Sequence, residues 1–166
     1  MRKLVKIVGS TIIGLIAVLL LMSFTGFEPK DCEPTDKSVS CEVPGLWLKG
    51  EPVTTPVTDW SFTDKIPQIK IQTQSAFLLP HSVTIWCAEY NGNLYVTSRP
   101  GRMWVEDAIR DPRVRLKIGD QLFDRTLSVV DDPAEKAAVL QTKGKKYPQW
   151  KVPSVSASTV FRVNPA

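Results

Sequence analysis

Hydroxyl and basic side chains gather in one short segment, residues 97–102 (Thr-Ser-Arg-Pro-Gly-Arg). Hydroxyls, guanidinium groups and the free N–H groups of a helix N-terminus are donors that bind phosphate, and the helix dipole adds a favourable field. A helix is expected to begin at this segment, so Thr97, Ser98, Arg99 and Arg102 are candidate anion-binding residues. The alternative is that the two arginines are solvated charges flanking a Pro-Gly loop.

His81 is the only histidine in the chain. An imidazole titrates near neutral pH and could act as a general acid or contact a ligand ring, but we favour a structural role in the loop after Pro80. With no second histidine and no Cys/His cluster at ligand spacing, a zinc or copper site has too few ligands, and no metal site is predicted. The sequence also lacks a G-x-S-x-G elbow, a glycine-rich dinucleotide loop and a P-loop.

Two β-hairpins are expected to position these residues. Four segments rich in β-branched and aromatic residues are the predicted strands: 83–90, 94–98, 114–118 and 121–130. Asn91-Gly92 joins the first pair and favours a type I′ turn, which needs positive φ at both residues. Gly119-Asp120 offers a second tight turn between the other two strands.

A short helix is expected between the hairpins, over residues 102–110. Its apolar residues fall on one helical face: Trp104, Val105, Ala108 and Ile109. Pro112 prevents much continuation. Further strands are predicted at 69–73 and 155–163, and a second helix at 132–142, where an Asp-Pro-Ala-Glu start has the pattern of a capped N-terminus.

The order of these elements resembles a known superfamily. Pro80-His81-Ser82-Val83, the tryptophan-bearing strand that follows, and Trp104 followed by Asp111-Pro112-Arg113-Val114 are similar to the split β-barrel flavoproteins. These are the pyridoxamine-phosphate-oxidase-like proteins, in particular their deazaflavin-dependent, nitroreductase-like branch. The resemblance covers roughly residues 60–163. It implies a mainly β domain with short helices, of the α+β class, built as a split β-barrel.

The resemblance also implies a cofactor, FMN or an F420-like deazaflavin, in a cleft often completed by a second subunit. Ser98, Arg99 and Arg102 fall where the family holds the cofactor phosphate. Trp86 and Trp104 are candidates to shape the ring pocket, because they lie before and after the anion segment and aromatic faces bury a large area. The alternative is that these tryptophans pack in the core or at the rim of a small barrel.

An uncharged, mostly apolar run occupies residues 7–27 and follows Arg2, Lys3 and Lys6. At about 1.5 Å per residue it can cross a hydrocarbon core about 30 Å thick, so we interpret it as a transmembrane anchor in the lipid bilayer. The alternative is a cleaved signal peptide, which would have a shorter apolar region. The positive-inside rule leaves residues 1–6 in the cytoplasm and the rest, in a bacterium, in the periplasm, as a single-pass inner-membrane protein.

Residues 28–58 are expected to link the anchor to a barrel domain over residues 59–166. Cys32 and Cys41 bracket a polar segment of this linker, and we predict a disulfide between them, which would contribute roughly 2 to 3 kcal/mol of stability in an oxidising compartment. Cys87 lies in a predicted strand and is expected to be a buried thiol.

Charge argues against a nucleic-acid partner. The formal net charge of +4 includes the three basic residues of the N-terminus, so the rest of the chain is nearly neutral. The basic run at 143–146 (Lys-Gly-Lys-Lys) is expected to lie in a solvated loop, and the alternative is that it contacts lipid head groups or a ligand phosphate.

These observations predict a membrane-anchored, exported oxidoreductase that uses FMN or a deazaflavin to reduce or oxidise a small or quinone-like acceptor. The cofactor carries the redox chemistry, so the absence of a catalytic triad does not exclude it, and no catalytic residue is singled out. The rival is a non-enzymatic accessory or ligand-binding subunit of a membrane complex. Some split barrels bind haem, and His81 would then be the candidate axial ligand. The predicted partners are a second copy or a membrane-complex subunit.

Overall fold

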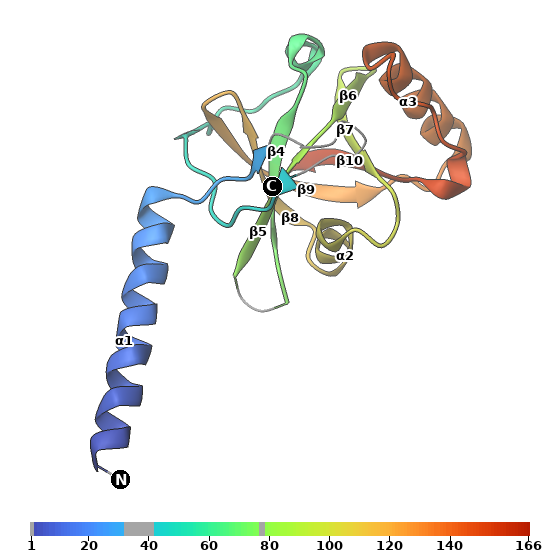
Figure 1. Cartoon of the computed structure of the whole chain (residues 1–166). Helices are drawn as coiled ribbons and strands as arrows, with labels where there is room; N and C mark the ends of the chain where they lie inside the picture. The colour runs from blue at the N-terminus through green and yellow to red at the C-terminus, as the bar shows by residue number, and fades with distance from the viewer. Residues whose placement is uncertain (1, 32–41, 77–78) are drawn as a thin grey trace.

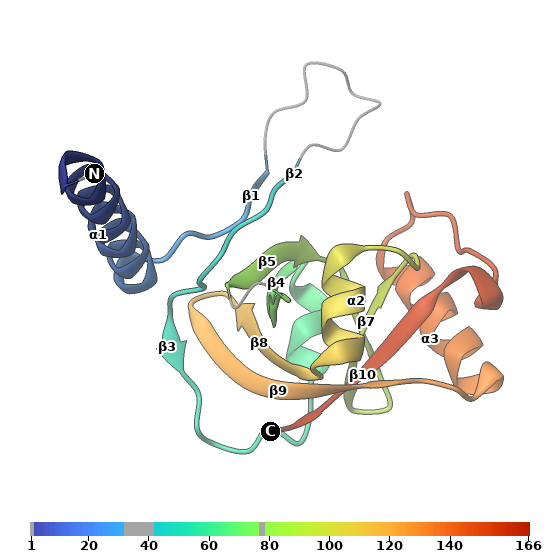
Figure 2. The ribbon, with the colours of Figure 1, turned by 90° about the horizontal axis from the view of Figure 1, so that it is seen from below.

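The computed structural model describes residues 2–31, 42–76 and 79–166 of the 166-residue chain. A long N-terminal helix, α1 (Arg2–Thr25), extends away from a mainly β domain (Figures 1 and 2). Cys32 and Cys41, for which a disulfide is predicted, lie outside the described residues.

The β domain contains short strands and two further helices. The strands are β1 (Lys30–Asp31), β2 (Glu42–Val43), β3 (Glu51–Pro52), β4 (Ile69–Gln74), β5 (Pro80–Ile85), β6 (Cys87–Tyr90), β7 (Asn93–Ser98), β8 (Arg113–Ile118), β9 (Gln121–Val129) and β10 (Thr159–Pro165). The helices are α2 (Met103–Arg110) and α3 (Pro133–Lys146), with 3₁₀ turns η1 (Ser61–Lys65) and η2 (Val155–Ala157). The predicted mainly β fold with short helices is confirmed.

The main sheet curls so that its first and last strands are consecutive in the sequence. Its strands follow the order β5-β4-β8-β9-β10-β7-β6, every neighbouring pair antiparallel, while β3 pairs with β9 in parallel. The first and last strands of this path, β5 and β6, are separated only by Trp86. One interrupted strand therefore pairs with β4 through its first half and with β7 through its second half, which gives the sheet a barrel form.

Alternation of side chains along the strands separates the barrel interior from its outer face. In β4 and β8 the buried positions alternate with partly exposed ones, as expected for strands with one face in a core. In β7, Leu94 and Val96 belong to the interior cluster, whereas Tyr95 belongs to a second cluster with Val139 and Leu140 of α3. Helix α3 thus covers the outer face of β6 and β7 (Figure 1).

The turn chemistry of both predicted hairpins is confirmed. Asn91 and Gly92 have φ values of 52° and 78°, as a type I′ turn requires, and Tyr90 pairs with Asn93 across it. Gly119 has φ 60°, and Ile118 pairs with Gln121.

Two predicted strand boundaries and the predicted buried face of α2 are wrong. The predicted strand 83–90 begins earlier, at Pro80, so His81 lies within β5 opposite Thr73 rather than in a loop. The last strand begins at Thr159 because residues 155–157 form η2. On α2, Ile109 is 61% exposed, and Asp107 is buried instead. Asp107 is held there by polar partners, which a pattern of apolar residues cannot indicate.

Helix α1 contains a stretch that is long and apolar enough to span a membrane. Residues Ile7–Thr25 have a mean hydropathy of 2.5 in their most apolar window, none of which is buried against the rest of the protein. By length and composition this stretch agrees with the predicted anchor.

The segment after α1 is attached to the barrel. Phe27 exchanges backbone hydrogen bonds with Leu46 and Trp47, and Gly45 exchanges two with Ser82 of β5, at 2.8 and 2.9 Å. Leu48 is buried, and its amide donates to the side chain of Gln72. Residues 45–48 of the predicted linker therefore pack against the barrel surface.

Candidate functional site

The predicted anion segment lies at the junction of β7 and α2. Ser98 ends β7, and Arg102 is the N-cap residue of α2, with an extended backbone and no side-chain cap. Gly101 has φ 78°, a conformation that glycine adopts without strain. Arg99 and Arg102 are exposed, and within the described chain neither forms an ion pair with a carboxylate.

The first turn of α2 adds free donors to this junction. The amides of Val105 and Glu106 bond to the carbonyl of Arg102, at 2.9 and 3.1 Å, whereas those of Met103 and Trp104 have no backbone acceptor in the part of the chain described. The N-terminus of a helix with unpaired amides and two nearby cations favours an anion. The junction therefore presents the kinds of donor that suit a phosphate group.

The Thr97 side chain does not face the junction of β7 and α2. It is on the opposite face of β7, where its hydroxyl accepts a hydrogen bond from the ammonium group of Lys143 on α3. Both residues are buried. The structure thus brings Ser98, Arg99 and Arg102 to one junction and directs the Thr97 side chain towards α3.

Both predicted ring-pocket tryptophans are engaged in protein contacts. Trp104 is 5% exposed and packs in the barrel interior, with its ring centroid 5.8 Å from that of Phe161. Trp86 lies outside the barrel and stacks on Tyr147, with centroids 4.6 Å apart and ring planes 8° from parallel. Trp104 therefore belongs to the interior cluster, whereas Trp86 does not.

His81 packs against α2. Its Nδ1 lies 3.5 Å from an Asp107 carboxylate oxygen and has no hydrogen-bond partner among the described residues, and its side chain is 14% exposed. Asp107 also accepts a hydrogen bond from Arg110 at 2.7 Å and one from the Thr73 hydroxyl at 3.4 Å. This polar cluster joins β4 and β5 to α2.

The last turn of α3 carries a buried basic residue that the sequence prediction missed. Lys143 is 4% exposed, and its ammonium group lies 4.4 Å from the Trp150 ring centroid and 5.7 Å from that of Trp86. Burial lowers the pKa of Lys143 from 10.5 to about 8. The predicted solvated loop at 143–146 is wrong, because α3 continues to Lys146. The spacing of Val139 and Lys143, four residues apart, could have indicated a shared helical face.

Cys87 lies beneath this turn of α3. It is a fully buried free thiol, as predicted, and burial raises its pKa. Lys146 places its ammonium group 3.6 Å from the sulfur and donates to the carbonyl of Thr63 at 2.8 Å. The hydroxyl of Tyr147 lies 3.0 Å from the Cys87 carbonyl. These contacts fix α3 to β6.

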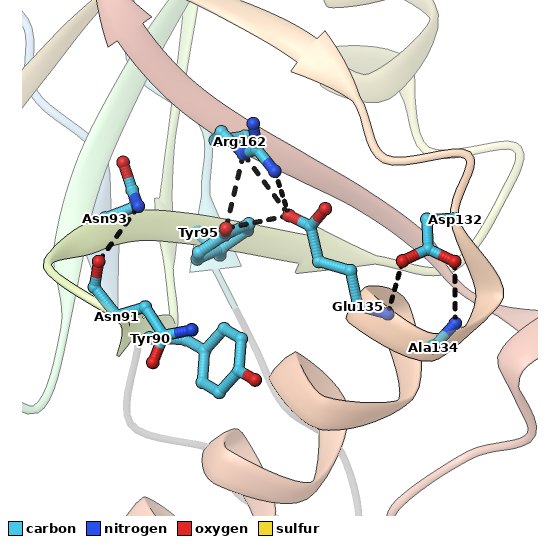
Figure 3. Close-up of a pocket in the computed structure, with 8 residues that line it drawn as sticks. All are labelled: Tyr90, Asn91, Asn93, Tyr95, Asp132, Ala134, Glu135 and Arg162. Carbon is cyan, nitrogen blue, oxygen red and sulfur yellow. Dashed lines mark hydrogen bonds and ion pairs between the residues drawn. The ribbon is translucent and has the colours of Figure 1, made fainter.

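Two surface hollows lie away from the anion junction. One, of about 400 Å³, contains a polar network in which Glu135 accepts hydrogen bonds from Tyr95, at 2.7 Å, and from Arg162 (Figure 3). The bond from Arg162 holds the pKa of Glu135 below its usual range. The other, of about 680 Å³, contains Trp60 and Arg125. Neither hollow is lined by Ser98, Arg99 or Arg102.

Comparison with known proteins gives the fold. No protein-family model and no curated protein matches the sequence. A haem storage protein from Vibrio cholerae is similar in structure, with 16% identity and a TM-score of 0.54, over 63% of this chain and 85% of that one. An F420 reductase has 17% identity and a TM-score of 0.52, over 68% of this chain and 96% of that one. A Listeria innocua protein named for pyridoxamine 5′-phosphate oxidase has 14% identity and a TM-score of 0.52, over 63% and 88%.

The fold is a split β-barrel. The predicted resemblance to the pyridoxamine-phosphate-oxidase-like proteins is confirmed at the level of architecture. At such identities the shared feature is the arrangement of strands and helices, and function has to be argued from the site.

Proposed function

We propose that this protein is a membrane-anchored, exported split-barrel oxidoreductase that binds FMN or a deazaflavin. The observation that carries the proposal is the junction of β7 and α2, where Arg99 and Arg102 lack a carboxylate partner in the described chain beside two unpaired helix amides. The split-barrel architecture, shared with an F420 reductase, supports a cofactor of this type.

The residues of the junction fit the phosphate end of such a cofactor. Arg99 and Arg102 would bind its charge, and the Ser98 hydroxyl and the free amides of α2 would fix its orientation. Trp86 and Trp104 fit the ring less well, because each already packs against a neighbouring ring. We therefore propose that a second copy of the chain completes the ring pocket. When bound, the cofactor supplies the electron or hydride transfer.

The proposed location follows from α1. Its apolar stretch can span the bilayer, and basic residues precede it, so the barrel would lie in the periplasm with the N-terminus in the cytoplasm. The attachment of residues 27 and 45–48 to the barrel would keep the domain close to the membrane surface. A quinone-like acceptor suits that position.

A second candidate function is an accessory or ligand-binding module, in its most specific form a haem-binding one. The fold is shared with a haem storage protein, and the Asp107 carboxylate faces Nδ1 of His81, as in sites where a carboxylate orients a metal-binding imidazole. Because His81 is largely buried, haem binding would require β5 and α2 to separate locally.

The discriminating experiment is an absorption and fluorescence spectrum of the detergent-solubilised full-length protein. The wild type is compared with Arg99→Ala/Arg102→Ala and with Arg113→Ala, a control that removes an exposed arginine paired with Asp111. A flavin or deazaflavin spectrum that only the double variant loses would support the proposal. A colourless wild type that takes up neither added FMN nor a deazaflavin would overturn it. A haem spectrum would favour the second candidate.

A further inference from the structure

The hollow of about 680 Å³ lies at the opposite end of β7 from the anion junction. It is lined by residues 53–58, Trp60, the hairpin residues 92–93, Asp124 and Arg125, and residues 163–166. Its volume is in the range of small-molecule sites, about 300 to 1,000 Å³. The hairpin turn precedes β7 and Ser98 ends it, so a separation on the order of 17 Å along the strand keeps the hollow apart from the proposed cofactor site.

The walls of this hollow are largely apolar and are fixed by the barrel. Trp60 is buried and belongs to the interior cluster, and Val53 and Val57 pack against that cluster. The Val53 amide donates to the carbonyl of Leu122 at 2.8 Å, which holds this side of the hollow against β9. One wall of the hollow is therefore continuous with the barrel interior.

One cation faces this apolar surface. The guanidinium carbon of Arg125 lies 5.5 Å from the ring centroids of both Trp60 and Phe123, and one of its nitrogens donates to the Asp124 carbonyl at 2.7 Å. The Asp124 carboxylate is occupied by Arg115, which binds both oxygens at 2.6 and 2.9 Å. Arg125 thus has no ion-pair partner within the described ranges.

The surroundings of Arg125 indicate the chemistry of a ligand. Burial lowers the pKa of Arg125 and the nearby Asp124 carboxylate raises it, but a guanidinium group stays protonated at neutral pH in any case. A cation would be repelled, and a neutral apolar molecule would leave the charge uncompensated. A carboxylate can accept two parallel hydrogen bonds from a guanidinium group. Three threonines along residues 54–58 add hydroxyl donors at the rim.

We propose that this hollow binds a small organic monocarboxylate, with the carboxylate on Arg125 and an apolar or aromatic body against Trp60 and Val57. The site does not depend on the proposed function, because it shares no residue with the junction of β7 and α2. It would be a second ligand site of the barrel, suited to an aromatic acid or a short aliphatic acid.

The test is a titration of the full-length protein in detergent with benzoate, and with benzamide as the neutral analogue of the same shape. Tryptophan fluorescence and isothermal titration calorimetry report binding. Benzoate is expected to bind saturably and to lose about 10- to 100-fold in affinity in Arg125→Gln, the range for a hydrogen-bonded charge pair. Arg125→Lys is expected to retain part of the affinity, and benzamide to bind weakly to all three proteins.

Two further variants separate loss of the site from loss of the fold. Val57→Phe fills the hollow and keeps the charge, so it is expected to abolish benzoate binding while the circular dichroism spectrum is unchanged. Arg113→Gln removes an exposed arginine elsewhere and is expected to bind benzoate like the wild type. Equal benzoate affinity in the wild type and folded Arg125→Gln would overturn the proposal, as would the absence of saturable binding to the wild type.

Discussion

Replacing Glu28 with glutamine is expected to weaken the attachment between α1 and the barrel. Glu28 accepts hydrogen bonds from the ammonium groups of Lys70 on β4 and Lys117 on β8, each at 2.6 Å, and from the backbone amide of Lys49 at 3.1 Å. Its side chain is 24% exposed. Because one carboxylate neutralises two lysines from neighbouring strands, glutamine would leave both charges uncompensated.

The expected loss in the free energy of unfolding follows from the pKa shift of Glu28. Burial alone would raise its pKa, but the hydrogen bonds from Lys117 and Lys70 outweigh burial and lower it from 4.5 to about 2. At about 1.36 kcal/mol per pKa unit, this shift sets an upper limit of about 3 kcal/mol. Partial exposure of Glu28 and Lys70 allows solvent screening, so we expect a loss of about 1 to 2 kcal/mol in the free energy of unfolding.

The stabilisation by Glu28 is expected to decrease as the pH falls. The pKa of Glu28 is lower in the folded state than in the unfolded chain, so the folded state binds fewer protons and the stabilisation is fully present above about pH 5. It is lost as the pH falls through about 2. The stability difference between the wild type and Glu28→Gln should therefore narrow on acidification.

Urea unfolding of the full-length protein in detergent, followed by tryptophan fluorescence, measures this difference. Glu51→Gln is the matched control, because Glu51 is exposed on β3 and forms no ion pair with any described residue. The reasoning would be refuted if Glu28→Gln unfolded at the same urea concentration as the wild type at neutral pH. It would also be refuted if the difference did not narrow between about pH 5 and about pH 2.

Two further predictions concern α3. Burial lowers the pKa of Lys143 from 10.5 to about 8, so the unfolded chain binds more protons between these values and stability rises with pH there. Lys143→Met should remove this rise in the free energy of unfolding, which is at most about 3 kcal/mol. If urea unfolding of the wild type and of Lys143→Met showed the same pH dependence, the attribution of the rise to Lys143 would be contradicted. Asp132→Ala removes the helix cap formed with the amides of Ala134 and Glu135, both at 3.1 Å, and should cost about 1 kcal/mol in the same assay. Asp132→Asn, which keeps a capping oxygen, should cost clearly less.

The hairpins, both short helices and the apolar α1 could be predicted because their signals are local. Asn91-Gly92 tolerates the positive φ values of a tight turn, and the start of α3 places a capping carboxylate three residues before Glu135. Such preferences act within a few residues and need no distant partner. The place of Arg99 and Arg102 beside the start of α2 could be predicted for the same reason, whereas their role in binding an anion stays a prediction.

The sequence alone could not show which face each side chain presents to distant elements. Thr97 and Ser98 are neighbours in the same predicted segment, yet successive residues of a strand point to opposite faces, and only the packing of α3 decides that Thr97 bonds to Lys143. Trp104 enters the interior because the barrel lies against that face of α2. Burial of polar groups depends on partners far along the chain.

The sequence by itself determined the local elements, the candidate membrane span and the cluster of anion-binding residue types. The tertiary structure decided that the strand broken at Trp86 joins both ends of the sheet, that Glu28 meets Lys70 and Lys117, and that Arg125 faces an apolar hollow. The division has a physical cause. Turn and helix preferences arise from the backbone and near neighbours, whereas closure of the sheet and compensation of buried charge depend on contacts between residues far apart in the chain.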